Sequence, residues 1–572
     1  MSGYDIDVRT IRLVLMLTAF VPPQLTAEPG PFPWLAQPIT TLHVATNGND
    51  TTGNGTELSP FRTIARAAQS AQPGTEIRLH SGQQHPGGAY LENLHGNATN
   101  PIWIRGPGPT NRALIVGGSE GLHLTKPRYV MLQHLEIAGA SDNGINIDDG
   151  SAYNDSDAAG FLVISNVLVR DIGSNGNQDG IKLSGLRDFY LFDMEAGRCG
   201  GSASGSGVDM VGCHRGLIAR GSFYDLSANA IQIKGGSSDI EVRQCIVSNA
   251  GHRGINIGGS TGFEFFRPPL ATNSVNVEAH SIRIFANVFI GGTATVAFAG
   301  STNCIVANNT IIEPTRWVFR ILQETVSSGG IVFAPCSANG FHNNIVYYRH
   351  AIVNRYVNEG SNTDPSSFSI RHNLWYPFDQ PAATPHPLPG TVSGNVFGRD
   401  PLFAQPAAHD FRITAVSPAT TNGWPGAGAL RDIADQAFLQ PPSIGAREIN
   451  GDIDSDTLPD YWEMASFTTL VHDATSDPDV DLMNNRDEHL ADTHPFDPAS
   501  RLAFIAITEI DGILTARWTG GQKARQWIET APSPTATNWL PLATFTPPTP
   551  ITNQLTLAPD QTLLRIRGSP SI

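Results

Sequence analysis

The amino-acid sequence predicts an all-β protein, a right-handed parallel β-helix with an N-terminal capping helix and a small C-terminal β-sandwich. The first observation is a phrase that recurs from about Gly144 to Gly259, in which a small residue precedes alternating apolar and polar residues. This period-2 pattern is typical of a strand with one buried face. The second observation is the spacing of the apolar anchors, which lie 36, 27, 23, 24, 41 and 23 residues apart: Ile145, Ile181, Val208, Ile231, Ile255, Val296 and Phe319. A minimum spacing near 23 residues that some intervals exceed indicates a solenoid with a fixed coil length and loops inserted into some of its turns.

Short apolar runs and asparagine-rich corners lie between these phrases. Runs such as Phe161-Leu-Val-Ile and Cys304-Ile-Val-Ala have the length of a strand, and corners follow several of them, at Asn287, Asn308-Asn309 and Asn343-Asn344. A helical solenoid would require amphipathic segments of period 3.6, which this region lacks. Two or three short strands per coil with Asn or Gly corners therefore predict the parallel β-helix.

The N-terminal region is predicted to direct export. Residues 1–27 resemble a signal peptide, because Arg9 and Arg12 precede an apolar run that begins at Leu13. A Pro-rich arm is expected over residues 28–40. No apolar run reaches the roughly 18 residues that a membrane span needs. We therefore expect a secreted, periplasmic or cell-surface protein without a membrane span.

The β-helix is predicted over residues 41–448 and is expected to begin with a capping helix. Ser59 is a natural N-cap, Pro60 suits the first helical position, and Pro73-Gly74 would end the helix. This arrangement resembles the start of secreted β-helix enzymes, in which a short helix covers the open end of the coil stack. Such a cover protects strand edges that would otherwise stay unpaired.

Charge and cysteine content narrow the function classes. The net charge is −16, but residues 452–497 hold thirteen Asp or Glu and one Arg, so most of the acidity is local. No basic stripe exists, which argues against a nucleic-acid partner. The five cysteines are scattered without a CxxC pair and are predicted to be buried thiols of the β-helix interior: Cys199, Cys213, Cys245, Cys304 and Cys336.

Residues 449–500 are predicted to form a linker of calcium-binding repeats. Oxygen donors stand twice at positions 1, 3, 5, 9 and 12 of a calcium loop: Asp452, Asp454, Asp456, Asp460 and Glu463, then Asp477, Asp479, Asp481, Asn485 and Glu488. The usual Gly at position 6 is replaced by Thr457 and Leu482. The stretch resembles the dockerin and thrombospondin-type-3 repeats of large secreted bacterial enzymes, which implies a structural spacer that holds calcium.

The last segment, residues 501–572, alternates apolar and polar residues in three runs. This pattern predicts the small β-sandwich. We expect it to serve in attachment to a substrate or a surface, since nothing in it has the composition of a catalytic site.

Candidate site residues follow from the expected stacking of coils. In a parallel β-helix, outward side chains of successive coils form ladders about 4.8 Å apart per step. One predicted ladder is Asn146, Lys182, Asp209, Gln232, Asn256, Ala297 and Arg320, and its neighbour is Asp148, Ser184, Val211, Lys234, Gly258, Ala299 and Leu322. Two of the chain's four lysines thus project from one face with Asp209 between them. We expect titratable amines, and nearby Arg253 or Arg320 would lower a lysine pKa towards that of a general base.

Loops are expected to complete this face. The 41-residue interval contains an insertion from Thr261 to Pro269 that carries Phe265 and Arg267. Aromatic faces stack on sugar rings, and arginine pairs with carboxylates in a bidentate way. The predicted substrate-binding residues are therefore Phe265, Arg267, Arg316, Arg320 and Glu324.

A resemblance to a known family rests on one phrase. The sequence Asp179-Gly-Ile-Lys182-Leu-Ser-Gly is similar to the Gly-x-Lys-Leu-Gly-Gly phrase around the catalytic lysine of family-nine pectate lyases. One coil earlier those enzymes carry an acidic calcium cluster, and this chain has Asp142-Asn-Gly-Ile-Asn146 with Asp148 and Asp149 adjacent. The resemblance covers about residues 40–375. It implies β-elimination on a uronic-acid polysaccharide, with a catalytic calcium ion near Asp142, Asn146 and Asp148 or an arginine in its place.

Under this hypothesis Lys182 or Lys234 is the base that removes the C5 proton. Arg253, Arg267 and Arg320 would neutralise the substrate carboxylate, and His252 and Asp209 are candidates for proton transfer. Two other classes stay open: a glycoside hydrolase that pairs Asp209 with Asp148 or Glu324, and a non-catalytic carbohydrate-binding solenoid. A uronate epimerase would share the lyase's proton abstraction. In each case we expect an acidic polysaccharide as partner and a monomeric protein.

Overall fold

The structure is a computed structural model that describes residues 36–173, 176–201, 204–414, 416–449, 456–467, 469, 471–510, 513–522, 524–531, 539–546, 549–557 and 564–570. The predicted signal peptide (1–27) and most of the arm (28–40) lie outside these ranges. The chain divides into two compact units, the first ending at Glu448 and the second beginning at Ile449. Within the described residues, no helix combines the length and apolar character that a membrane crossing requires.

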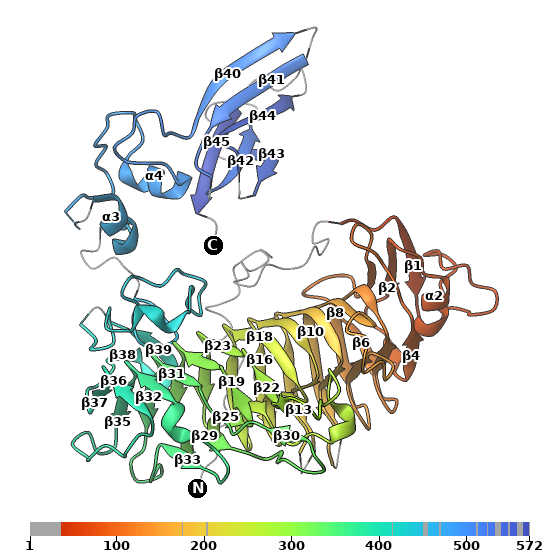
Figure 1. The fold of residues 1–572 in the computed structure, drawn as a ribbon. Helices are drawn as coiled ribbons and strands as arrows, with labels where there is room; N and C mark the ends of the chain where they lie inside the picture. The colour runs from red at the N-terminus through yellow and green to blue at the C-terminus, as the bar shows by residue number, and fades with distance from the viewer. Residues whose placement is uncertain are drawn as a thin grey trace. The chain divides into compact units, whose positions relative to one another are not determined.

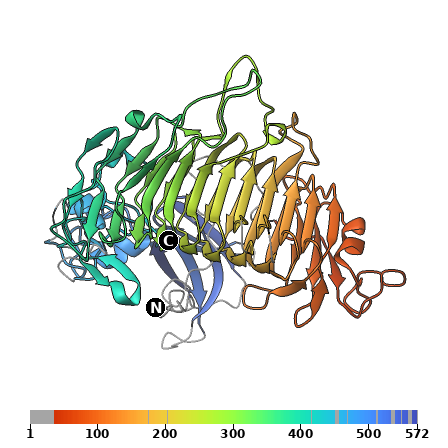
Figure 2. The ribbon, with the colours of Figure 1, turned by 90° about the horizontal axis from the view of Figure 1, so that it is seen from below.

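The first unit is a right-handed parallel β-helix (Figures 1 and 2). One of its faces is a ten-stranded sheet, which we call the front sheet. Its strands pair in parallel in the order β4 (Ala89–Glu92), β7 (Leu122–Thr125), β9 (Ile145–Asp148), β11 (Ile181–Ser184), β14 (Val208–Val211), β17 (Asn229–Lys234), β20 (Arg253–Gly258), β25 (Ala294–Ala299), β29 (Trp317–Leu322) and β33 (Val357–Glu359).

Two further faces complete each coil. The second contains β1 (Thr40–Val44), β2 (Thr75–Leu79), β5 (Ile102–Arg105), β8 (Arg128–Ala138), β10 (Ala159–Ile172), β12 (Leu186–Phe192), β15 (His214–Ala219), β18 (Ser237–Arg243), β22 (Ala279–His280), β23 (Arg283–Phe285), β26 (Ser301–Thr302), β27 (Ile305–Ala307), β31 (Gly340–His342), β34 (Ser369–Arg371) and β36 (Thr391–Ser393). The third contains β3 (Gln84–Pro86), β6 (Ala113–Val116), β13 (Glu195–Cys199), β16 (Ser222–Leu226), β19 (Ile246–Ala250), β24 (Val288–Ile290), β28 (Thr310–Ile312), β32 (Ile345–Tyr348), β35 (Leu374–Pro377) and β37 (Val396–Phe397). The long strands β8 and β10 run from the second face onto the third, which joins the two faces into one sheet.

The core is the stack of inward side chains predicted from the repeated phrases. All seven anchors, from Ile145 to Phe319, are fully buried, and each pairs in register with the anchor of the next coil. The five cysteines are also buried and unpaired, as predicted. Burial raises the pKa of Cys213 and Cys245 to about 12, so these thiols are packing groups and not nucleophiles.

The predicted asparagine corners form a hydrogen-bonded ladder inside the coils. The side-chain amide of Asn309 donates to Asn344 Oδ1 over 2.9 Å, and that of Asn344 donates to Asn373 Oδ1 over 3.0 Å. The residue before each of these asparagines has a positive φ, which turns the chain from the second face to the third. Each buried amide thereby satisfies backbone groups at a corner where strand pairing is interrupted.

The capping helix is present but begins later than predicted. It is α2 (Ile64–Ser70), and its N-cap is Thr63, whose hydroxyl accepts a hydrogen bond from the Arg66 amide. The predicted N-cap, Ser59, is wrong, because Asp50 accepts hydrogen bonds from the Arg62 and Thr63 amides and holds this stretch extended. Ile64 and Ala67 form the buried side of the helix.

Short elements close the first unit. A two-stranded pair joins two insertions, β21 (Val275–Asn276) and β30 (Val332–Phe333), and β38 (Phe403–Gln405) pairs with β39 (Asp410–Ile413). Four single-turn 3₁₀ helices are described: η1 (Phe263–Phe265), η2 (Pro365–Ser367), η3 (Pro406–Ala408) and η4 (Pro425–Ala427).

The second unit has two helices followed by six described strands. The helices are α3 (Asp460–Phe467) and α4 (Asn485–Ala491). The strands form two three-stranded antiparallel sheets, which is the predicted small β-sandwich: β40 (Ala503–Ile510), β41 (Ile513–Thr519) and β44 (Thr552–Leu557), then β42 (Ala524–Thr530), β43 (Leu540–Phe545) and β45 (Leu564–Pro570). Trp518 is its largest buried side chain and packs against Phe545.

Candidate functional site

The outer face of the front sheet carries one continuous polar ladder. The strand registers place ten side chains in line, all of them polar except Ala297: Tyr90, His123, Asn146, Lys182, Asp209, Gln232, Asn256, Ala297, Arg320 and Asn358. Tyr90 and His123 precede the predicted ladder, and Asn358 follows it. Both predicted ladders therefore have the expected register, with Lys234 beside Val211 in the second.

A cluster of two lysines and two aspartates lies at the middle of this ladder. Asp209 Oδ2 contacts Lys182 Nζ directly and lies 3.4 Å from Lys234 Nζ. Asp179 Oδ2 lies 3.4 Å from Lys182 Nζ. The side chains of Lys182 and Lys234 are 21% and 14% exposed, whereas those of Asp179 and Asp209 are 1% and 2% exposed. The two lysines are therefore partly exposed, and the two carboxylates that they contact are buried.

The charges of this cluster depend on one another. Burial works against the ammonium of Lys182, but Asp209 and Asp179 outweigh it and raise the lysine pKa above its ordinary value. The expected lowering of this pKa is therefore wrong, because the nearest charges to Lys182 are carboxylates and not arginines. Burial and the charge of Asp209 raise the pKa of Asp179, whereas Lys182 and Lys234 overcome burial and hold the pKa of Asp209 low.

Backbone hydrogen bonds fix Asp179 in place. Its Oδ1 accepts a hydrogen bond from the Ser206 amide at 2.8 Å, and its own amide donates to Asn143 Oδ1 at 2.9 Å. Asp209 Oδ1 is buried and has no hydrogen-bond partner among the described residues. This oxygen is available to a proton carried by a neighbouring group.

Arginines gather towards β29, one to three coils beyond Lys234. Arg253 donates to Asn256 Oδ1 at 2.8 Å and pairs with Glu324 at 2.5 Å. Arg320 donates to Asn358 at 2.9 Å, and its guanidinium lies 4.6 Å from the centre of the Trp317 ring. Arg316 is exposed and lies 4.1 Å from the same ring. Four predicted residues thus meet at this end of the ladder, with Trp317 between the arginines.

The structure corrects the prediction for Arg267. It is buried, and its guanidinium donates to both oxygens of Asp149, at 2.6 and 2.8 Å, while stacking on Tyr153 at 4.5 Å. A Cβ at Gly185 would lie 2.1 Å from Asp149 Oδ2, and one at Gly212 would lie 2.5 Å from Arg267 Cβ. Glycines at these two turns leave the space in which Arg267 lies. Arg267 therefore holds the insertion to the β-helix and cannot clamp a substrate carboxylate.

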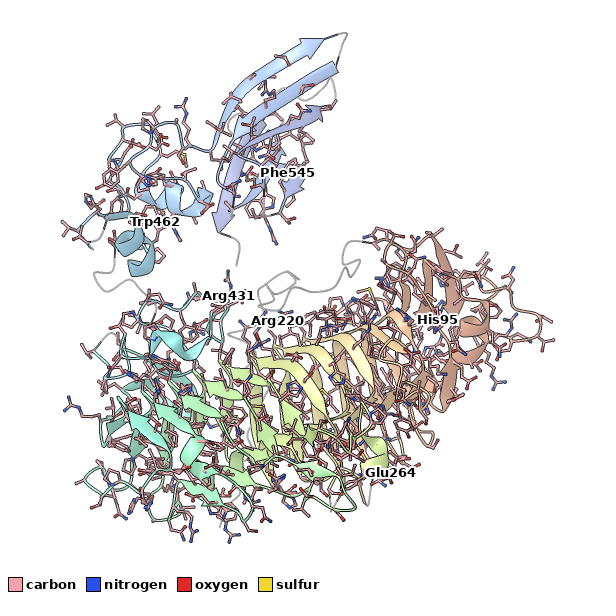
Figure 3. All side chains as sticks on the ribbon, viewed as in Figure 1. His95, Arg220, Glu264, Arg431, Trp462 and Phe545 are labelled. Carbon is pink, nitrogen blue, oxygen red and sulfur yellow. The ribbon has the colours of Figure 1, made fainter. Side chains whose placement is uncertain are left out.

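A second buried carboxylate anchors the insertion where it leaves the front sheet. Glu278 accepts hydrogen bonds from the amides of Gly235 and Thr261, at 2.8 and 3.0 Å, and from the hydroxyls of Thr261 and Thr325. Phe266 packs on Phe333 of β30, so the two insertions support each other. Phe265 remains 47% exposed on η1, on the side of the β-helix where Figure 3 marks Glu264.

His252 lies on the turn before β20. Its backbone amide donates to the Ala228 carbonyl at 2.7 Å, and the residue is exposed. No contact with Lys182, Asp209 or Lys234 is present for this residue. Its proposed part in proton transfer stays a prediction without a geometric basis.

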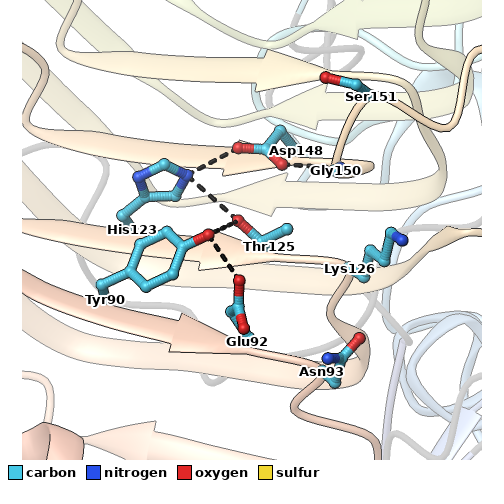
Figure 4. Close-up of a pocket in the computed structure, with 9 residues that line it drawn as sticks. All are labelled: Tyr90, Glu92, Asn93, His123, Thr125, Lys126, Asp148, Gly150 and Ser151. Atoms are coloured by element: carbon cyan, nitrogen blue, oxygen red, sulfur yellow. Dashed lines mark hydrogen bonds and ion pairs between the residues drawn. The ribbon is translucent and has the colours of Figure 1, made fainter.

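Sequence reasoning missed a polar cavity at the β4 end of the front sheet (Figure 4). The cavity has a volume of about 360 Å³ and is lined by Tyr90, Glu92, Asn93, His123, Thr125, Lys126, Asp148, Gly150 and Ser151. His123 bridges Asp148 and Glu120, at 2.7 and 2.6 Å, and the bonds to Asp148 and Glu120 raise its pKa to about 9. The run Gly121-Leu-His-Leu-Thr repeats the phrase that marks later coils, and this signal could have found His123.

The same contacts bear on a catalytic calcium ion near Asp142, Asn146 and Asp148. Asp148 is bound by His123 and by the Gly150 amide, and Asp149 is bound by Arg267. Asp142 is exposed. These cations already neutralise two of the carboxylates, so the contacts lend the calcium prediction no support.

The second predicted calcium loop has the features of a cation site. Ligand atoms of Asp477, Asp479 and Asp481 lie within 4.8 Å of one another. Glu488 is fully buried, and neither of its carboxylate oxygens has a hydrogen-bond partner among the described residues. Burial and the charges of Asp479, Asp481 and Asp477 raise the pKa of Glu488 to about 8. An unpaired buried carboxylate beside three others fits a divalent cation.

In the first predicted loop, Asp452 and Asp454 lie outside the described residues, as does the side chain of Asp460. Asp456 and Glu463 are described, and Glu463 is fully buried. Thr457 and Leu482, which replace the usual Gly, have φ values of 81° and 80°. Both therefore adopt the left-handed backbone that a glycine would adopt at this position without strain.

Comparison with known proteins gives structural likeness only. No family model matches the chain, and no curated protein matches it. Among solved structures, pectate lyase Pel9A is 15% identical over 73% of this chain and 98% of that chain, with a TM-score of 0.46. An alginate lyase from Paenibacillus sp. str. FPU-7 is 15% identical over 58% and 99%, with a TM-score of 0.36.

Hydrolases occur among the similar structures as well as lyases. The catalytic domain of a GH87 α-1,3-glucanase is 12% identical over 61% of this chain and 70% of that chain, with a TM-score of 0.32. Likeness at these levels does not choose between the two reactions, so the choice rests on the side chains of the front sheet.

Proposed function

We propose that this protein is a polysaccharide lyase that cleaves a uronic-acid-containing polysaccharide by β-elimination on the front sheet. One observation carries the proposal: two scarce lysines reach solvent on either side of one buried carboxylate, Asp209, with arginines on the next coils. Amines supply the proton transfers, and arginines supply the charge that stabilises the enolate-like transition state.

The geometry supports different roles for the two lysines. Lys182 touches both Asp209 and Asp179, which keep it protonated, so it suits the acid that protonates the leaving oxygen. Lys234 touches only Asp209 of these two and lies on the coil next to Arg253, so it suits the base. In this assignment Lys234 takes the C5 proton, the C5 electron pair forms the C4–C5 double bond, and the C4–O bond breaks towards the proton of Lys182. Arg253 faces the substrate carboxylate.

The principal alternative is a glycoside hydrolase, and a specific observation favours it. Asp179 and Asp209 have pKa values shifted in opposite directions, which is the arrangement of an acid and a nucleophile. Against it, both carboxylates lie beneath the lysines and are almost fully buried. A hydrolase would need these oxygens to touch the glycosidic bond.

The experiment that tests the lyase is ultraviolet absorbance during incubation with pectate, alginate, glucuronan and glycosaminoglycans, together with a reducing-end assay. The lyase predicts both new reducing ends and the absorbance of a C4–C5 double bond. Reducing ends without absorbance would establish the hydrolase instead. Asp209→Asn separates the two reactions further. In a hydrolase this substitution would abolish activity. In the lyase it would remove the charge that raises the Lys182 pKa, and the pH–rate profile would shift to lower pH.

A structural role is proposed for the second unit. We propose that the loop of Asp477, Asp479, Asp481 and Glu488 binds calcium, on the observation that Glu488 is buried without a partner for its oxygens among the described residues. Calcium would supply the positive charge that these four carboxylates lack and would fix the start of α4. Isothermal titration of the full chain with calcium tests this proposal, and Glu488→Gln is expected to weaken the binding.

A further inference from the structure

The two ends of the front-sheet ladder carry opposite charge. At the β20–β29 end, Arg316 and Arg320 flank Trp317, and Arg253 forms an ion pair with Glu324, the one carboxylate that pairs with these three arginines among the described residues. Burial, and after it the neighbouring charge of Arg253, lower the pKa of Arg320. Three guanidinium groups beside one carboxylate leave an excess of positive charge there. Such a site favours an anionic group, and Trp317 adds an aromatic face for a sugar ring.

The β4–β9 end is polar but has no excess of positive charge. The imidazolium of His123 lies between the carboxylates of Glu120 and Asp148. A third carboxylate, Glu92, and a second cation, Lys126, also line the cavity (Figure 4). Because both nitrogens of His123 are occupied by carboxylates, its charge is already neutralised. Three carboxylates thus face two cations, His123 and Lys126, so an incoming carboxylate would meet a net negative charge that Lys126 offsets only in part.

The cavity is nevertheless well built for an uncharged sugar. The Tyr90 ring is 51% exposed, and its hydroxyl is fixed by donating to Glu92 at 2.8 Å and accepting from Thr125 at 3.2 Å. A sugar ring stacks on such a fixed aromatic face, and its hydroxyls donate to the carboxylates of Glu92 and Asp148. Tyr90 lies on the same ladder as Lys182, three coils or about 14 Å away by the usual spacing of strands.

We infer that the front sheet selects a heteropolysaccharide, with a uronate bound at the Arg253–Arg320 end and an uncharged sugar bound in the Tyr90–His123 cavity. This inference rests on the proposed function, since it names the substrate class of the same face. A polymer made only of uronates would place a carboxylate in the cavity and is disfavoured there.

Binding to short oligosaccharides tests the inference without catalysis. The probes are a hexasaccharide of alternating glucuronate and N-acetylhexosamine and a hexasaccharide of galacturonate, titrated by calorimetry on ice with the full chain. We expect at least tenfold tighter binding of the alternating probe. Glu92→Gln should reduce the ratio of the two affinities several-fold, because the cavity would then admit a carboxylate. Tyr90→Ala should weaken the binding of the alternating probe more than that of the galacturonate probe. Arg320→Gln should weaken the binding of both probes.

Glu57→Gln, a substitution of an exposed residue outside the front sheet, is the matched control and should change neither affinity. Equal affinities, tighter binding of the uniform probe, or no binding of either would overturn the inference. The absorbance assay reports separately on the reaction. If absorbance appears but the two probes bind equally, the lyase stands and the heteropolysaccharide substrate is rejected. If the alternating probe binds more tightly but no absorbance appears, the substrate preference stands and the lyase is rejected.

Discussion

At the scale of single residues, the charge states of a few side chains decide what the front sheet can do. Lys182 and His123 are both held as cations by two carboxylates each. Both side chains are 21% exposed, but the Lys182 ammonium has three N–H donors for its two carboxylate partners, whereas both nitrogens of His123 are bound. The lysine is thus available to a substrate, and the histidine is an organising charge.

The charge of His123 makes stability depend on pH. Its folded pKa of about 9 lies above the ordinary value of 6.5, so its contribution is fully present below about pH 6.5 and disappears as the pH rises through 9. At pH 6 we expect the wild type to have a higher melting temperature than His123→Gln. At pH 10 we expect the two melting temperatures to be equal. Nuclear magnetic resonance titration of the imidazole should give a midpoint near 9. A midpoint near 6.5 would show that the two bridges do not form.

A second residue-scale prediction concerns Leu482. Its φ of 80° is a left-handed conformation that costs a side-chain-bearing residue about 1 kcal/mol relative to glycine. Leu482→Gly should therefore raise calcium affinity several-fold, by calorimetry of the full chain. Leu482→Ala removes the exposed side chain but keeps the strain and is the matched control. An equal gain in both variants would assign the effect to the side chain instead.

Residue chemistry was the part least predictable from sequence. The ladder that holds Lys182, Asp209 and Arg320 follows from a repeat of period 2, so its register could be predicted. Asp179 is assigned no role from the sequence, although its partner Lys182 is only three residues away. Arg267 is assigned a wrong role, because the partner of Arg267, Asp149, lies on a distant coil. The distance between Asp149 and Arg267 is 118 residues along the chain, and no local pattern encodes that pairing.

At the scale of elements, the insertion between β20 and β22 is held at both ends by buried carboxylates. Glu278 binds the start of the insertion and the Thr325 hydroxyl, and Asp149 binds Arg267 further along. The insertion is thus a fixed part of the β-helix surface. The sequence predicts its existence from the 41-residue interval, but it does not predict the anchors.

The contribution of the Asp149–Arg267 ion pair to the free energy of unfolding can be tested. Removing one partner of a buried ion pair leaves an uncompensated charge, which costs about 3–5 kcal/mol. Arg267→Leu should lower the melting temperature of the first unit and expose residues 259–278 to protease. The double variant Arg267→Leu with Asp149→Leu should recover much of the loss. Arg316→Leu, at an exposed position, is the control, and an equal effect of Arg316→Leu and Arg267→Leu would refute the role of the pair.

At the scale of the whole molecule, the chain has two units with different sources of stability. The first has a continuous apolar core along its coils, which the regular spacing of the anchors made predictable. The second contains clustered carboxylates near α4, which the proposed calcium ion would neutralise. Calcium removal should therefore affect the second unit and spare the first.

Differential scanning calorimetry tests this expectation. A chelator should lower the unfolding transition of the second unit by several degrees and leave that of the β-helix unchanged. Because Glu488 has a pKa of about 8 without metal, the carboxylate needed for binding forms as the pH rises through 8, and calcium affinity should increase from pH 6 to pH 9. A pH-independent affinity, or a loss of the β-helix transition, would contradict this account.

The most direct test of the central claim is the initial rate of absorbance for paired substitutions of the two lysines, on whichever polymer the wild type cleaves. Arginine keeps the charge but cannot act as a base. We expect Lys234→Arg and Lys234→Ala to lower the initial rate equally, by at least a hundredfold, since both substitutions remove the base. Lys182→Arg should retain measurably more activity than Lys182→Ala, since the charge beside Asp209 remains. Full activity of Lys234→Arg would contradict the assignment of Lys234 as the base, and full activity of both alanine variants would remove the front-sheet cluster from the reaction.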